Sequence, residues 1–208
     1  MEKNRILILF AHPALHKSRV NKILIKAVQD LEHVTFHNLY EAYPEFDIDV
    51  QEEQKLLVQN DVVILHHPFY WYSTPAILKE WQDLVLEHNW AYGSKGKTLT
   101  GKKMLTVTTT GGSEAAYQLD GYNRNTIRQL LAPIEQTARL CGMEYLPPFV
   151  VHGTHTMTTE NILEHAKDYR RTVIGLRDGS IDIEYVHKFQ RLNQHLDQIF
   201  KTPDNPEN

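Results

Sequence analysis

The sequence predicts a doubly wound α/β fold, in which helices cover both faces of a five-stranded parallel sheet. Five short apolar segments, rich in β-branched residues, alternate with longer amphipathic segments along the 208 residues. Three of these segments end in loops whose residues suit a bound ligand, and such loops gather at the carboxyl edge of a parallel sheet. Crossovers between the strands are expected to be right-handed. The predicted strands span residues 5–11, 34–40, 61–66, 103–109 and 147–152.

The first strand is followed by a loop and a helix that together suit a phosphate group. Residues 12–17 form the loop, and Ser18 caps a helix that runs to about Asp30. A helix amino terminus presents unpaired N–H groups and the positive end of its dipole to an anion. Ser18 and Asn21 add side-chain donors in the first turn. The alternative is that Ser18 is an ordinary helix cap, and no Gly-x-Gly-x-x-Gly pattern of a dinucleotide-binding fold is present.

The third strand leads into four consecutive aromatic residues. Pro68 has no N–H for a sheet ladder, so we expect strand pairing to stop at His67-Pro68. A loop this aromatic, at the carboxyl end of a buried strand, is typical of the place where open α/β sheets bind flat ligands. The alternative is that the rings plug the edge of the sheet. The run comprises Phe69, Tyr70, Trp71 and Tyr72.

The fourth strand ends in a turn rich in threonine and glycine. Thr109 and Thr110 precede Gly111 and Gly112, and consecutive glycines let the backbone approach a ligand with unobstructed N–H groups. Tyr117 follows five residues after Gly112. In the flavodoxin-like strand order, the three loops meet at the switch point where a mononucleotide sits. Three chemically suitable loops on one edge are a stronger signal than any one of them.

The remaining elements connect and cover the strands. Ser73 or Thr74 is expected to cap the helix after the aromatic run, with Pro75 at its first position. Pro133 should kink or restart the helix that begins at Asn123. The predicted helices after the first span residues 50–60, 76–87, 123–141, 159–176 and 183–200, and residues 43–49 and 90–96 are loops.

Composition limits the class of protein. Charged residues make up 23% of the chain and the net charge is −4, so nucleic acid is not expected as a partner. The single Cys141 excludes an intramolecular disulfide, and no apolar run reaches membrane-spanning length, so we expect a soluble cytoplasmic protein. The 12 histidines form no complete ligand set, so no metal site is predicted. We expect a domain over residues 1–180, then a C-terminal helix and a disordered polar tail over 181–208.

Together these motifs resemble the flavodoxin-like NAD(P)H:quinone oxidoreductases. The likeness rests on residues 11–13 with Ser18 and Asn21, on residues 67–73 and on residues 109–112. A further likeness is to the bacterial branch that includes the ancillary proteins of the Kef glutathione-gated potassium-efflux systems. It rests on Trp90-Ala91-Tyr92-Gly93 and Leu146-Pro147-Pro148-Phe149, and the whole likeness covers about residues 5–169.

The resemblance implies a homodimer that binds FMN, with FMN favoured over FAD. Such an NAD(P)H dehydrogenase (quinone) takes a hydride from NAD(P)H and passes two electrons to a quinone in a ping-pong reaction. The Kef branch implies a second role, as a regulatory subunit that binds and activates a potassium-efflux transporter at the inner face of the membrane. An electron-carrier flavodoxin is a weaker third option, because the chain is long and its first loop lacks a short Ser/Thr-Gly phosphate loop.

The resemblance also implies a role for each matching residue. The flavin phosphate would lie beside His12 and against Ser18, Arg19, Val20 and Asn21. The ribityl chain and one side of the isoalloxazine would lie against Pro68, Phe69, Tyr70, Trp71 and Tyr72. The N1/O2 and N5 edge of the ring, where a hydride leaves negative charge, would face backbone N–H groups of Thr109, Thr110, Gly111 and Gly112.

Catalysis is assigned to Gly111, Gly112 and Tyr117 on the same resemblance. Tyr117 matches a tyrosine that the mammalian quinone reductases pair with a histidine in the loop after Gly-Gly. The aligned position here is Asn123, which does not titrate near neutral pH. The proton relay of those relatives is therefore not expected to run through this position.

Overall fold

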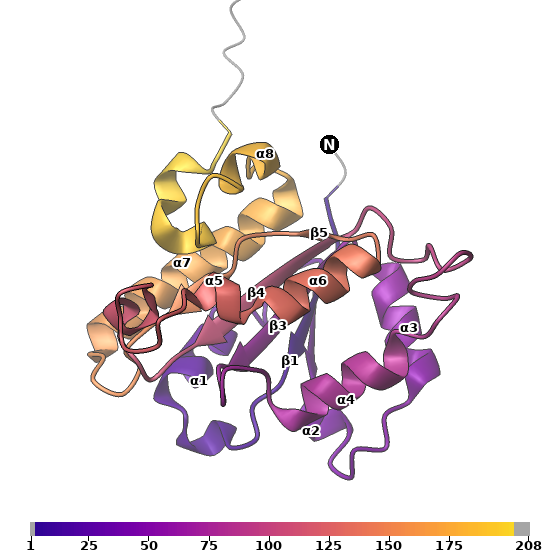
Figure 1. The fold of residues 1–208 in the computed structure, drawn as a ribbon, viewed down its shortest axis with the longest axis horizontal. Helices are drawn as coiled ribbons and strands as arrows, with labels where there is room; N and C mark the ends of the chain where they lie inside the picture. The colour runs from indigo at the N-terminus through magenta and orange to yellow at the C-terminus, as the bar shows by residue number, and fades with distance from the viewer. Residues whose placement is uncertain (1–2, 202–208) are drawn as a thin grey trace, which may run out of the picture.

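Five parallel strand positions form the central sheet of the computed structural model, which describes residues 3–201 (Figure 1). The strand order is β2-β1-β3-β4-β5, and β6 pairs with β4 beyond the end of β5. Every strand pair is parallel, so the predicted doubly wound sheet of five strands is confirmed. The strands are β1 (Ile6–Phe10), β2 (Val34–Asn38), β3 (Val62–Pro68), β4 (Lys103–Thr109), β5 (Glu144–Tyr145) and β6 (Phe149–Val151).

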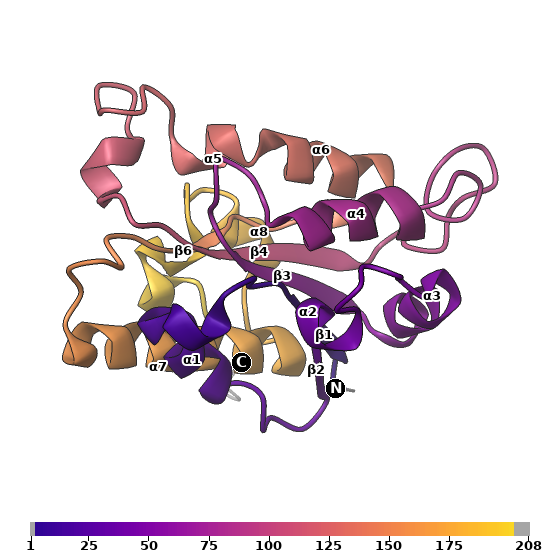
Figure 2. The same ribbon diagram turned by 90° about the horizontal axis from the view of Figure 1, so that it is seen from below.

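Helices cover both faces of the sheet, as Figure 2 shows. Alternate residues of β1 enter two separate cores: Leu7 and Leu9 pack with α3, α4 and α6, whereas Ile6 and Ile8 pack with α1 and α7. Both faces of the strand are therefore buried, as its unbroken apolar sequence predicts. The helices are α1 (Arg19–Lys26), α2 (Leu39–Ala42), α3 (Val50–Gln59), α4 (Ala76–Val85), α5 (Ile127–Leu130), α6 (Ala132–Leu140), α7 (Thr159–Asp178) and α8 (Ile183–Val186).

The fifth strand position is split by a bulge. Met104 pairs with Tyr145 and Val107 with Phe149, so three residues of the outer strand lie opposite two of β4. Two of the three are prolines, which cannot donate to the ladder. After the bulge, β6 is again paired with β4. The loop that follows β6 therefore lies at the same edge of the sheet as the loop that follows β4.

β3 runs further than predicted. His67 and Pro68 pair with β4, and Phe69 N donates to Thr109 O at 2.9 Å, so the expected stop at His67-Pro68 is wrong. Along a strand, successive backbone N–H groups point alternately toward the strand on one side and the strand on the other. The N–H of Phe69 points toward β4, so the N–H that Pro68 lacks would point toward β1. Since β1 ends at Phe10, opposite His66, the proline removes no ladder bond.

The cap predicted for α4 is also wrong, whereas the helix restart at Pro133 is confirmed. Pro75 holds the N-cap position of α4 without a side-chain hydrogen bond, and the Thr74 hydroxyl is buried without a protein partner in the described part of the chain. The reason is that Ser73 is used in a turn with Tyr70, so the helix begins only at Ala76. In the later helical region, α5 ends before Pro133, which sits in the first turn of α6.

The C-terminal segment, residues 181–201, is not the helix predicted over 183–200. It contains α8 and two short 3₁₀ turns, Leu192–Gln194 and Leu196–Gln198. Asn193 bonds both the N–H and the C=O of Val150, at 3.1 and 2.9 Å, so the segment covers the outer edge of β6. The boundary at residue 180 stays a prediction, and the tail from residue 202 lies outside the described residues. Between residues 3 and 201, no helix is long and apolar enough to cross a bilayer.

Candidate functional site

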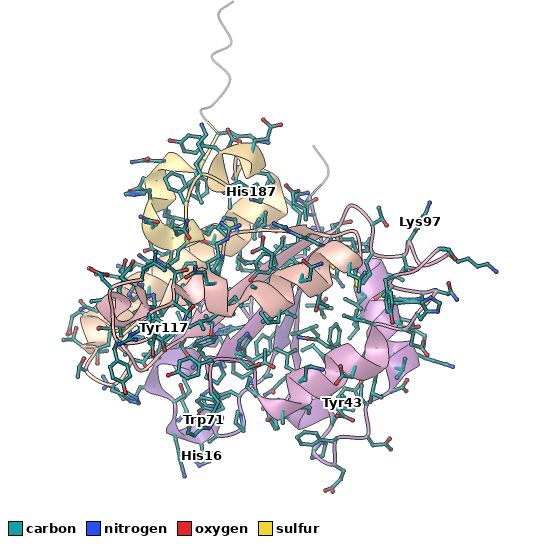
Figure 3. The ribbon with its side chains drawn as sticks, in the orientation of Figure 1. His16, Tyr43, Trp71, Lys97, Tyr117 and His187 are labelled. Atoms are coloured by element: carbon teal, nitrogen blue, oxygen red, sulfur yellow. The ribbon has the colours of Figure 1, made fainter. Side chains whose placement is uncertain are left out.

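A cavity of about 450 Å³ lies at the carboxyl edge of the sheet. Loops after β1, β3, β4 and β6 contribute to its wall, so the three predicted loops do meet, together with a fourth. Figure 3 places His16, Trp71 and Tyr117 at this end of the molecule, toward which the strand arrows point. The predicted site residues that line the cavity are His12, Ser18, Arg19, Val20, Asn21, Pro68, Phe69, Tyr70, Thr109 and Gly111.

Asn21 holds three elements together at one end of the cavity. Its side chain is 2% exposed, and its amide nitrogen donates to Ser18 Oγ at 3.0 Å and to Thr109 Oγ1 at 3.1 Å. Its Oδ1 atom lies 3.0 Å from His66 Nε2, which therefore carries the proton. Both hydrogens of the Asn21 amide are bonded within the protein, so this side chain is not the donor to a phosphate that the sequence predicted. Instead, its hydrogen bonds form a tether that connects α1, β3 and β4.

Ser18 remains suited to contact an anion. It is the N-cap of α1, and its Oγ accepts from Asn21 N at 3.1 Å, while its hydroxyl hydrogen stays available to a ligand. Lys17 and Arg19 line the same end of the cavity. Two cationic residues and the positive end of an eight-residue helix therefore lie in the same part of the cavity wall, which is an arrangement that favours a phosphate.

His12 is a neutral donor at this end. Its Nδ1 accepts from Ala14 N at 3.1 Å, which leaves the hydrogen on Nε2. Burial, with a smaller contribution from His16, lowers the pKa of His12 below its ordinary value. A neutral imidazole with one N–H can hydrogen-bond a phosphate oxygen without adding a further charge to the site.

The aromatic run forms a strained and exposed turn rather than a plug. Tyr70 and Ser73 exchange backbone hydrogen bonds at 3.2 and 2.9 Å, and the two residues between them, Trp71 and Tyr72, have φ of 50° and 63°. Such turns normally use Asn-Gly, because a side chain at positive φ costs roughly 1–2 kcal/mol. Trp71 is 93% exposed, and only Phe69 of the four rings is buried. Strain and exposure in the same aromatic residues point to a binding surface.

The glycine turn presents two adjacent donors. Within the described residues the N–H groups of Gly111 and Gly112 donate to no protein acceptor. Thr110 differs, because its N–H donates to Val151 O at 2.9 Å, and the prediction that it faces a ligand ring is corrected accordingly. Thr109 likewise lies within β4, paired with Pro68 and Val151. The ladder thus ends immediately before the two glycines.

Tyr117 lies beside these glycines and contacts two rings. Its ring centroid is 6.0 Å from that of Phe69 and 5.4 Å from that of His152. Burial raises the pKa of Tyr117. Asn123 does not take the place of a histidine partner, because its Oδ1 accepts from Tyr72 Oη at 3.1 Å.

The sequence patterns did not predict the contribution of the loop after β6. Thr154 and His155 line the cavity, and a Cβ added to Gly111 would lie 2.3 Å from His155 Nε2, so the imidazole rests on the glycine backbone. Parallel topology could have predicted it, because the fifth strand must end at the same edge of the sheet as the first, third and fourth strands. Among residues 3–201, no group of three or more His, Cys, Asp or Glu side chains could hold a metal ion.

Comparison with known proteins agrees with this geometry. The family model described as "Flavodoxin-like fold" matches residues 4–173. The glutathione-regulated potassium-efflux system ancillary protein KefG of Yersinia pestis (strain Pestoides F) is 42% identical over 169 residues, which are 81% of this chain and 93% of the relative.

Two solved structures are similar over nearly their whole length. The general stress protein 14 of Treponema denticola, in complex with FMN, is 39% identical with a TM-score of 0.79, covering 83% of this chain and 99% of that one. An NADPH-quinone reductase from P. pentosaceus is 34% identical with a TM-score of 0.74, covering 81% and 96%. The family match, the KefG likeness and the shared fold lead to one conclusion: the chain belongs to the flavodoxin-like family that includes KefG and the NAD(P)H:quinone reductases.

Proposed function

We propose that the protein is an FMN-dependent NAD(P)H oxidoreductase that reduces quinones or similar electrophiles by two electrons. The observation that carries the proposal is the pairing of two unlike ends in one cavity. One end gathers Lys17, Arg19 and the amino terminus of α1. The other end includes Gly111, and the N–H groups of Gly111 and of its neighbour Gly112 donate to no protein acceptor in the described part of the chain. A flavin mononucleotide has a dianionic phosphate at one end and an electron-accepting ring at the other.

The residues fit this cofactor. The cavity volume of about 450 Å³ lies within the ~300–1,000 Å³ typical of small-molecule sites. The stretch between the two ends is lined by Pro68, Phe69 and Tyr70, which offer apolar and aromatic surface to a planar ring system. The relative from T. denticola that is similar in structure is itself in complex with FMN, which supports the same choice here.

The bound flavin would supply a centre that accepts a hydride and releases two electrons to a second substrate. The chain would hold the phosphate through Ser18 and the cations near it, with Asn21 fixing Ser18 against β4. The N–H groups of Gly111 and Gly112 would stabilise the negative charge that the hydride brings to the ring edge. Tyr117 would supply a hydroxyl beside them.

We also propose a homodimer in which the second subunit covers the open side of the cavity. Trp71 and Tyr122 are 93% and 90% exposed, and Leu119 is 67% exposed. Large apolar side chains gathered near a site are typical of an interface. Light scattering should give twice the chain mass for the flavin-loaded protein, whereas a stable monomer that retains flavin would contradict the proposal.

A second candidate role is that of a regulatory subunit of a potassium-efflux transporter. The 42% identity with KefG, an ancillary protein of such a system, favours it, and the role would place the protein at the inner face of the membrane. The two roles are compatible, since a flavoprotein could report its redox state to a partner. Potassium efflux from cells that contain a Kef-type transporter, measured with and without the protein, tests this role.

The enzyme proposal is tested by spectrum and turnover. Purified protein should absorb near the flavin maxima, and the flavin released by heat should be FMN. It should oxidise NADH or NADPH in the presence of a small quinone, with each nucleotide assayed separately. If the protein binds FMN but shows no quinone-dependent turnover, the regulatory role would be favoured over the enzyme. If it does not bind FMN, both the enzyme and the regulatory flavoprotein would be contradicted.

A further inference from the structure

A long loop, residues 113–125, carries Tyr117 between β4 and α5. Its backbone hydrogen bonds run between its own residues, and within the described chain none of them reaches another element. Leu119 and Tyr122 are 67% and 90% exposed, so the tip of the loop adds little packing. The position of the loop therefore depends on the side chains that connect it to its surroundings.

Two side-chain hydrogen bonds connect this loop to the rest of the described chain. Tyr72 Oη donates to Asn123 Oδ1 at 3.1 Å, and Arg191 Nη2 donates to Glu114 Oε1. The second bond is also an ion pair, in which the arginine side chain is 14% exposed and the carboxylate side chain 55% exposed. Glu114 begins the 3₁₀ turn that ends at Tyr117, so this pair acts within one turn of the phenol.

The backbone around Arg191 is firmly anchored. Leu192 N donates to Pro148 O at 2.9 Å, and the Asn193 amide bonds both an N–H and a C=O group of β6. The Leu192 side chain is fully buried in the core between the sheet and α7. Arg191 thus stands on a fixed support, whereas Glu114 belongs to a loop that has few supports of its own.

Packing alone does not fix Tyr117. Its ring contacts those of Phe69 and His152, with centroid distances of 6.0 and 5.4 Å. A second cavity, of about 100 Å³, lies between the loop and the C-terminal segment, and its wall includes Tyr117, Glu114 and Arg191. The phenol borders this space and could shift toward it if the loop were not held in place.

We propose that Arg191 is a positioning residue for Tyr117, so that the C-terminal segment, residues 181–201, sets the place of the phenol beside the glycine turn. The inference rests on the proposed quinone reductase activity, in which Tyr117 supplies a hydroxyl there. Arg191 touches neither cofactor nor substrate in this role and acts through its ion pair with Glu114. The family model matches residues 4–173, so this device lies partly outside the region that the family model describes.

The first test measures the loop directly and needs no turnover. In Arg191→Gln, hydrogen–deuterium exchange of the protein as purified should become faster in peptides from residues 113–125, by about 2–5-fold, as expected for loss of a partly exposed ion pair. Glu114→Gln should give the same increase, and the double variant no further increase, because each change removes the same link. Glu114→Gln, on the exposed side of the pair, carries the test if Arg191→Gln does not fold.

The matched control is Arg171→Gln. Arg171 also holds the C-terminal segment, because its Nη2 lies 2.7 Å from Asp197 Oδ1, but neither residue belongs to the wall of the second cavity. This variant should leave exchange in residues 113–125 unchanged. Equal increases in Arg171→Gln and Arg191→Gln would show a general loosening of the segment and overturn the positioning role. Unchanged exchange in Arg191→Gln would overturn it as well.

The second test asks whether Arg191 acts through Tyr117. In stopped-flow measurements, Arg191→Gln should slow oxidation of the reduced flavin by quinone by about 2–5-fold and change flavin reduction by NAD(P)H by less than about twofold. Combined with Tyr117→Phe it should add little, because the hydroxyl that it positions is already absent. A fully additive loss would overturn the positioning role. If the wild-type protein transfers electrons to no quinone, the proposed function fails, and the exchange measurement still decides whether Arg191 holds the loop.

Discussion

The two ends of the cavity, which we call the phosphate end (around Ser18) and the ring end (around Gly111) after the proposed function, are stabilised in different ways. At the phosphate end, Asn21 is buried and hydrogen-bonded to Ser18, His66 and Thr109, and the helix that carries it packs against α7. Beside the ring end, directly after Tyr70 of the cavity wall, Trp71 and Tyr72 lie exposed in a turn with positive φ. The phosphate end gains stability from its contacts, whereas the ring end carries strain. Under the proposed function, the fold would fix where the cofactor is anchored and would leave the surface that meets substrates free to adapt.

The largest expected effect follows from loss of the tether. Asn21→Ala would leave His66 Nε2, Thr109 Oγ1 and Ser18 Oγ without this partner, and each unsatisfied buried group costs about 1–3 kcal/mol. We expect the free energy of unfolding to fall by about 3 kcal/mol or more, and the affinity for FMN to fall with it. Urea unfolding and flavin fluorescence titration measure the two quantities.

Two other substitutions set the scale for Asn21→Ala. Ser18→Ala loses the helix cap and should cost about 1 kcal/mol of stability. Asn60→Ala removes another buried asparagine, which makes one side-chain bond to Leu56 O at the opposite edge of the sheet, and it should leave FMN affinity unchanged. Equal FMN affinity for Asn21→Ala and wild type would show that the tether does not shape the phosphate end.

Acid should weaken the region beneath the phosphate end. Burial, with small contributions from His67 and His12, lowers the pKa of His66 to about 3, and burial lowers that of His67 to about 4. In the unfolded chain a histidine titrates near ~6.5. Between pH 6.5 and 4 the unfolded state therefore binds more protons, so stability is full above this window and falls as the pH drops through it.

The loss in acid should approach ~1.4 kcal/mol per pH unit for each of these two histidines. Unfolding by urea at several values between pH 7 and 4.5 measures the slope. His67→Met, which removes one buried ring, should flatten it, whereas the exposed His16→Asn should not. A slope that is the same in His67→Met and wild type would place the acid sensitivity elsewhere.

Relief of strain beside the ring end should raise the stability of the protein and lower its activity. Replacing Trp71 by Asn and Tyr72 by Gly gives the turn its preferred residues and should raise the free energy of unfolding by about 1–2 kcal/mol. The double variant should reduce quinone more slowly, because two exposed rings beside the cavity are lost. Leu119→Asn, at another exposed site, should not stabilise the fold. A double variant that is no more stable than wild type would show that the turn carries no strain.

The sequence predicted elements and edges better than it predicted bonds. The apolar runs predicted β1 to β4 and β6, but β5 (Glu144–Tyr145) lies outside the strand predicted over residues 147–152. The positions of the loops after β1, β3 and β4 at the carboxyl edge followed from parallel topology. Which N–H groups remain free to bind a ligand could not be predicted from the sequence. Asn21 and Thr110 both looked available in the sequence, but their amide groups are used by neighbours that are far away along the chain, Thr109 and Val151. Only packing decides which donors remain for a ligand.

Two further misses have the same origin. Leu192, Leu196 and Ile199 have helical spacing, yet they lie in a segment that follows the edge of β6, because Asn193 bonds to Val150. His152 carries no motif of its own, and its position beside Tyr117 depends on the bulge that brings β6 alongside β4. Contacts between distant segments, rather than local preference, determine both.

The smallest expected effect concerns hydride transfer at the ring end. From about pH 6 to 8 the rate of flavin reduction by NAD(P)H should change by less than about twofold, because hydride transfer needs no separate proton. The pKa of His152 lies at about 4, and burial raises the pKa of Tyr117. Tyr117→Phe should slow this step only modestly, since the N–H groups of Gly111 and Gly112 remain, and should slow quinone reduction more. Stopped-flow measurement of both half-reactions across this range decides the matter. A clear pKa near 6.5 in flavin reduction would mean that a histidine of the cavity, such as His12, becomes charged during the reaction despite its burial, and the phosphate end would then take part in chemistry as well as anchoring.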